Sequence, residues 1–141
     1  MRILMTSLFL FFFNYNTPVL ETGDMIRTEE DIAATNYELS KENILKIMEY
    51  YDLSNTDIVM AQARLETGNF TSRICKEYNN LFGLYDCSEK DYYKFTSWKE
   101  CILFYKIKIQ SRYKGGDYMK FLEDIGYAED KEYVDKLKLI I

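Results

Sequence analysis

The chain has 141 residues, enough for one domain, and its 48% hydrophobic and 29% charged residues are typical of a globular protein. A net charge of −5, with no strong cluster of lysines and arginines, disfavours nucleic acid as the main partner, because phosphate contacts supply most of that affinity. The sequence contains no histidine, which excludes Ser-His-Asp and Cys-His catalysis and any zinc site that uses histidine.

The start of the chain has the features of an exported protein. A short positive beginning precedes an apolar run over residues 3–13, which is too short to span a bilayer. We predict a signal peptide over residues 1–22, a linker or loose arm over 23–39, and one domain over 40–141. A buried N-terminal element and an uncleaved anchor are the alternatives. Signal removal would leave a secreted, periplasmic or cell-wall-associated protein without a membrane span.

Two helices are predicted at the start of the domain. Ser40 is a suitable N-cap, and apolar residues then recur on one helical face until about Asp52. Asn55 or Thr56 caps the second helix, and Gly68 ends it.

The remainder of the domain is also predicted to be mostly helical. Ser97 and Glu100 have the spacing of a capping box, which starts a long helix. The remaining predicted elements, in chain order, are a short helical turn over 72–77, a loop or small β-hairpin over 79–95, and helices over 98–113, over 118–125 and from Asp130 onward.

Glu66 is the carboxylate that the pattern singles out. It lies beside the apolar stripe of the second helix and in the last turn, where the carbonyl ends carry partial negative charge. That field and partial burial both raise a carboxyl pKa. A raised pKa is what a general acid for glycosidic cleavage needs, although an ordinary helix-terminal glutamate would look the same in sequence.

Four sequence blocks resemble the glucosaminidase family, glycoside hydrolase family 73, which includes bacterial autolysins. Residues 61–68 (AQARLETG) are similar to its AQAxLETG signature, and residues 79–84 (NNLFGL) to its NNLFG loop. Residues 95–98 (FTSW) resemble its (Y/F)xSW helix start, and residues 126–130 (GYAED) with Tyr133 resemble its GYATDxxY block. The blocks follow the family's order over 40–141.

The resemblance implies a mainly α, lysozyme-like fold with a cleft between a helical lobe and a small, shortened β lobe. It implies cleavage of the β-1,4 bond on the reducing side of N-acetylglucosamine in peptidoglycan, with Glu66 as general acid and Tyr127 holding the acetamido sugar. For Asn80 a loop cap is an equal alternative, and for Phe82 core packing is the favoured one. The substrate contacts that it implies are Gln62, Asn80, Phe82 and Trp98.

A second carboxylate is not identified by the sequence. Only Asp86, Glu89 and Asp91 lie in the short stretch where many family members carry one, and none is in a recognisable motif. The mechanism is therefore open between inversion, retention and participation of the substrate's own N-acetyl group.

The expected protein is a monomer that acts on peptidoglycan glycan strands without metal or organic cofactor. A lytic transglycosylase or muramidase is the rival enzyme, and a peptidoglycan-binding or phage structural module is the rival from another class. Two of Cys75, Cys87 and Cys101 could pair in an exported chain, and no pair is assigned.

Overall fold

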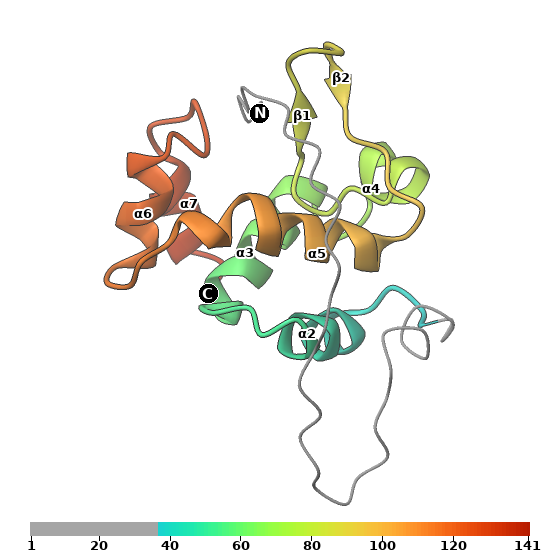
Figure 1. Ribbon diagram of the computed structural model, residues 1–141, viewed down its shortest axis with the longest axis horizontal. Helices are drawn as coiled ribbons and strands as arrows, with labels where there is room; N and C mark the ends of the chain where they lie inside the picture. The colour runs from blue at the N-terminus through green and yellow to red at the C-terminus, as the bar shows by residue number, and fades with distance from the viewer. Residues whose placement is uncertain (1–36) are drawn as a thin grey trace, which may run out of the picture.

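The computed structural model describes residues 37–141. This part is mainly helical with one two-stranded antiparallel sheet, which confirms the predicted fold class (Figure 1). The predicted signal peptide and most of the predicted arm lie outside the described residues. The elements are α2 (Lys41–Tyr50), α3 (Thr56–Thr67), α4 (Arg73–Tyr78), β1 (Tyr85–Asp86), β2 (Asp91–Tyr92), α5 (Trp98–Lys108), the 3₁₀ helix η1 (Gln110–Arg112), α6 (Tyr118–Asp124) and α7 (Tyr133–Lys138).

Short-range hydrogen bonds set most of the helix ends. The side chains of Ser40, Ser72 and Ser97 each accept a bond from the backbone N–H three residues later, so each satisfies one free donor of the first turn. Gly68 ends α3 with a φ of +56°, a left-handed conformation that glycine adopts without a steric penalty.

Two predicted boundaries differ from the structure. The helix expected over 98–113 ends at Lys108, and the chain continues as a 3₁₀ turn in which the Arg112 N–H bonds the Ile109 carbonyl. The last helix has Glu132 rather than Asp130 at its N-cap. Asp130 instead accepts a bond from the Glu132 N–H and orders the turn before the helix.

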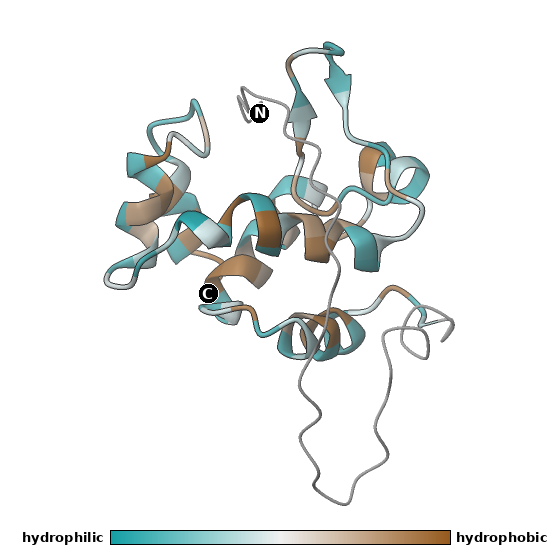
Figure 2. Ribbon diagram, viewed as in Figure 1, coloured by the Kyte–Doolittle hydropathy of each residue, from teal (hydrophilic) through white to brown (hydrophobic). Residues whose placement is uncertain are grey.

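The helices surround one apolar core. In the view of Figure 1, α5 crosses the middle of the domain, with α2 on one side and the β-hairpin on the other, while α6 and α7 close one end. Helix α3 contacts both α2 and α7, and α2 also contacts α5. Figure 2 shows hydrophobic segments on α2, α3 and α5 and a hydrophilic hairpin tip. The core therefore lies among the helices, and the hairpin projects from it. Within the described residues, no helix is long and apolar enough to cross a membrane.

Candidate active site

Glu66 stands in the last turn of α3 with its carboxyl group largely enclosed. Its Oε1 atom is buried and has no hydrogen-bond partner. Burial raises the pKa of Glu66 from 4.5 to about 7, because the charged form loses its hydration, and the Tyr133 hydroxyl partly opposes this rise. The whole residue is still partly exposed. About half of the Glu66 carboxyl groups therefore keep their proton near pH 7, on a residue that solvent can partly reach.

Gly83 brings the backbone of the loop after α4 against this carboxyl group. Its φ is +61°, and a Cβ atom added there would lie 2.9 Å from Glu66 Oε2. Real Cβ atoms essentially never approach another heavy atom so closely. The backbone conformation therefore favours glycine, and any larger residue here would displace the Glu66 carboxyl group.

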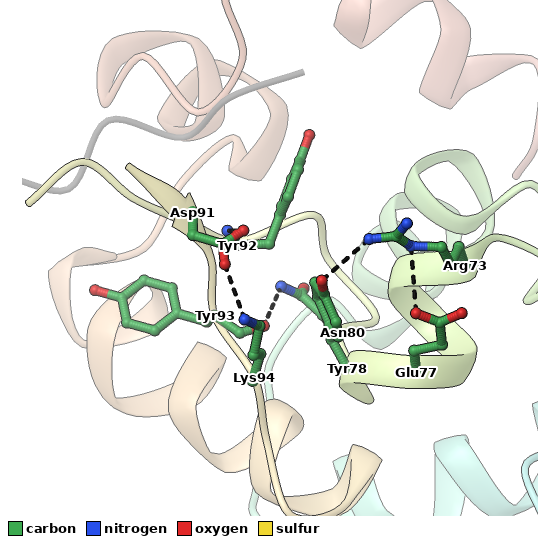
Figure 3. A network of polar contacts seen from close by, with 8 residues as sticks. All are labelled: Arg73, Glu77, Tyr78, Asn80, Asp91, Tyr92, Tyr93 and Lys94. Atoms are coloured by element: carbon green, nitrogen blue, oxygen red, sulfur yellow. Dashed lines mark hydrogen bonds and ion pairs between the residues drawn. The ribbon is translucent and has the colours of Figure 1, made fainter. Parts of the chain in front are cut away.

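Asn80 holds the loop that carries Gly83. Its side-chain amide donates to the carbonyl groups of Leu84 and Tyr93 at 2.8 and 3.0 Å, and its oxygen accepts from the N–H groups of Phe82 and Leu84 at 3.3 and 3.0 Å. These bonds use both donors and both acceptor positions of the amide. The residue is fully buried, and its bonds to the loop backbone fit the loop-cap alternative. Figure 3 shows it between α4 and the strand residues of the hairpin.

Tyr127 and Phe82 form a buried wall behind the same loop. Tyr127 is 1% exposed, and its hydroxyl donates to the Phe82 carbonyl at 3.3 Å. The Phe82 ring packs on the Tyr105 ring with a centroid separation of 4.4 Å, in agreement with the favoured core assignment. Tyr127 therefore holds the loop beside Glu66 through this hydrogen bond. The contact of Tyr127 with a sugar stays a prediction.

Tyr133 connects the acid to a hollow on the α6–α7 side of the domain. It stacks on Tyr127 with centroids 5.6 Å apart, and its own pKa is raised well above its usual range by burial and by the charge of Glu66. Tyr133 lines a hollow of about 350 Å³, together with Leu122, Glu123, Ala128, Glu129, Asp130, Lys131 and Val134.

The other two predicted substrate contacts lie mostly inside the protein. Gln62 is fully buried, accepts a bond from the Tyr105 hydroxyl at 2.6 Å and donates to the Tyr133 hydroxyl at 3.3 Å. Trp98 is 8% exposed at the start of α5. Both positions support the site from within, and their direct contact with a glycan stays a prediction.

The three candidate second carboxylates lie in the hairpin. Asp86 accepts bonds from Ser88 and from the Glu89 N–H, and these bonds hold its pKa below the usual range. Asp91 bonds Lys94 at 2.9 Å, which also lowers its pKa (Figure 3). Glu89 is exposed at the turn. Asp86 and Asp91 are therefore engaged in ordering the hairpin.

The three cysteines are free thiols in the structure. Cys75 and Cys101 are buried, and Cys101 accepts a bond from the Leu81 N–H, so it supports the loop from the core side. Cys87 is partly exposed in the hairpin turn. Among residues 37–141, no group of three or more Cys, Asp or Glu side chains is arranged to hold a metal ion.

Two residues beside the acid, Gly83 and Tyr133, were not predicted to belong to the site. Gly83 was visible in the NNLFG block, and a glycine inside such a loop is a signal for close backbone approach. Tyr133 was visible in the GYATDxxY-like block, but its direction toward Glu66 follows from the contact between α3 and α7.

The described residues form a mainly helical domain with an enclosed glutamate of raised pKa, and the chain has no histidine, so carboxylate-based chemistry such as glycosidic cleavage suits this site. Residues 41–141 match the Glucosaminidase family, described as mannosyl-glycoprotein endo-beta-N-acetylglucosaminidase, and the chain belongs to this family. The family supports a hydrolase of glycosidic bonds that acts on peptidoglycan. Comparisons with curated proteins and with solved structures returned no match.

Proposed function

We propose that the protein is an endo-β-N-acetylglucosaminidase that cleaves the β-1,4 bond after N-acetylglucosamine in peptidoglycan, with Glu66 as the general acid. The observation that carries the proposal is the enclosed Glu66 carboxyl group, whose pKa of about 7 keeps a transferable proton near neutral pH. We also propose that the chain is exported, because this substrate lies outside the cytoplasm and the apolar run over residues 3–13 fits a signal peptide.

The site favours participation by the substrate's own N-acetyl group. Asp86 and Asp91 are bound to hairpin partners, so neither can act as a nucleophile without losing these bonds, and Glu89 is exposed at the hairpin turn. In the proposed step the Glu66 proton goes to the glycosidic oxygen as its bond to C1 breaks. The acetamido carbonyl oxygen of the same sugar bonds to C1 and gives a cyclic oxazolinium ion.

The second half of the reaction restores the enzyme. A water molecule gives one proton to the Glu66 carboxylate and attacks C1, and the ring opens to regenerate the acetamide. Two displacements at C1 retain the configuration of the anomeric carbon. The newly formed end is therefore expected to appear first as the β anomer.

The test is digestion of purified peptidoglycan with wild type, Glu66→Gln and Glu49→Gln. Glu49 is a matched control, because it is also the next-to-last residue of its helix but is exposed. We expect wild type and Glu49→Gln to release reducing-end N-acetylglucosamine, and Glu66→Gln to lose at least about a hundredfold in rate, within the range for a general acid.

The products separate the proposal from its rivals. New 1,6-anhydro-muramyl ends would identify a lytic transglycosylase, and reducing-end N-acetylmuramic acid would identify a muramidase. Binding to the wall without new ends would identify a non-catalytic module. Each of these results, or an active Glu66→Gln variant, contradicts the proposal.

A further inference from the structure

A chain of buried polar side chains crosses the core from the α2–α3 turn to the neighbourhood of Glu66. It starts at the backbone of Ser54 and ends at a tyrosine on α7. The residues between the Ser54 peptide and Glu66, in order, are Gln110, Tyr118, Tyr105, Gln62 and Tyr133, each no more than 5% exposed. Directly bonded residues in it lie up to 71 positions apart in the sequence.

The first link fixes the orientation of an amide. The Ser54 N–H donates to Gln110 Oε1 at 3.1 Å, and Gln110 Nε2 donates to the Ser54 carbonyl at 2.6 Å. This two-bond pairing with one residue's backbone sets which end of the Gln110 side chain is the donor. The second hydrogen on Nε2 then points to the Tyr118 hydroxyl, 3.1 Å away.

The direction of each later bond follows from the one before it, because a tyrosine hydroxyl has only one proton to donate. Tyr118 accepts from Gln110, so its proton goes to the Tyr105 oxygen, 2.9 Å away. Tyr105 in turn donates to Gln62 Oε1 at 2.6 Å. The Gln62 amide is thereby oriented, and its Nε2 donates to the Tyr133 hydroxyl at 3.3 Å.

The last proton of the chain therefore belongs to Tyr133, whose hydroxyl interacts with the Glu66 carboxyl group. Tyr133 uses its oxygen to accept from Gln62, and its proton is left for the carboxyl group whose Oε1 atom is buried without a partner. We propose that this one-way chain of hydrogen bonds positions the Tyr133 hydroxyl as a donor to Glu66, and that Gln110, Tyr118, Tyr105 and Gln62 are positioning residues for the acid.

This inference rests on the proposed role of Glu66 as the acid. In the described residues, the titratable groups that interact with Glu66 are Tyr133 on α7 and Tyr127 in the segment between α6 and α7. Tyr127 donates to the Phe82 carbonyl, so its proton is engaged elsewhere. A donor to the ionised carboxyl group lowers its pKa, and losing that donor must raise it.

The experiment measures the Glu66 pKa directly by NMR, with glutamate labelled with carbon-13 at the side-chain carboxyl and the signal assigned by its loss in Glu66→Gln. We expect Tyr133→Phe to raise this pKa by up to about one unit, since a hydrogen bond to a charged group contributes on the order of 1.5 kcal/mol. We expect Tyr105→Phe, which does not touch Glu66, to raise it by a smaller amount in the same direction, because the Gln62 amide, no longer held by Tyr105, can turn its oxygen toward Tyr133 and accept the proton that Tyr133 gives to Glu66.

The matched control is Tyr113→Phe, which deletes a hydroxyl that bonds the Gly116 carbonyl outside the chain. It should leave the Glu66 pKa unchanged. Tyr118→Phe repeats the remote deletion at a second point, and thermal unfolding confirms that each variant is folded. An unchanged Glu66 pKa in folded Tyr105→Phe or Tyr118→Phe overturns the proposal.

A double variant tests whether the chain acts through Tyr133. In a Tyr133→Phe background, Tyr105→Phe should cause no further shift, whereas two additive shifts would contradict a relay. The pH dependence of kcat separates this proposal from the function itself. If the Glu66 pKa measured by NMR shifts but the alkaline limb of the kcat profile does not, the hydrogen-bond proposal holds and Glu66 is not the acid. If the Glu66 pKa measured by NMR does not shift, the hydrogen-bond proposal is refuted, whatever the activity of the variants.

Discussion

Replacing Glu66 with glutamine is expected to make the protein more stable at alkaline pH while reducing its activity at least about a hundredfold. The folded state raises the Glu66 pKa from 4.5 to about 7. Between these values the folded chain keeps a proton that the unfolded chain has released, so stability falls as the pH rises through this range. Above pH 7 the free energy of unfolding is lowered by the full amount, up to about 3 kcal/mol. Glu66→Gln cannot ionise and does not incur it.

Urea unfolding followed by circular dichroism provides the assay. We would compare wild type, Glu66→Gln and Glu49→Gln at about pH 4 and about pH 8, because the loss from Glu66 ionisation develops between these values. At each pH the free energy of unfolding of the wild type is subtracted from that of the variant. The change in this difference between the two pH values reports the ionisation of Glu66, because an effect of the glutamine side chain itself is the same at both. A difference that is the same at both pH values would show that Glu66 ionises normally, and it would refute the argument from burial.

Three further predictions concern activity and the loop. The rate of glycan cleavage should be flat below pH 7 and fall about tenfold per pH unit above it, because only protonated Glu66 is active; a rate that rises to pH 9 would contradict this. Gly83→Ala should displace the Glu66 carboxyl group and reduce kcat at least about tenfold. The control is Gly126→Ala, which introduces a similar backbone strain of ~1 kcal/mol, because Gly126 has a φ of +63° but open space around it, and it should leave kcat unchanged. Asn80→Ala should lower the free energy of unfolding in urea by at least about 2 kcal/mol, since it leaves buried backbone groups unpaired, and a loss below ~0.5 kcal/mol would mean that the loop holds itself.

Helix boundaries were predictable where the signal is local. The hydroxyl groups of Ser40 and Ser97 satisfy N–H groups three residues away, and Gly68 adopts its conformation without a partner from elsewhere in the chain. Such effects act within one turn, so the sequence carries them. The start of α7 was predicted too early because Asp130 has the same capping chemistry whether it begins the helix or orders the preceding turn.

The sequence by itself determined which residue is the candidate acid, since the absence of histidine leaves carboxylates for the chemistry and the motif around Glu66 selects one of them. Only the tertiary structure decided the environment of that carboxyl group. Gly83 approaches Glu66 from a different segment, and the Gln62 side chain bonds partners that lie 43 and 71 residues away. Burial and hydrogen bonding of this kind depend on how distant segments pack, and these contacts set the pKa.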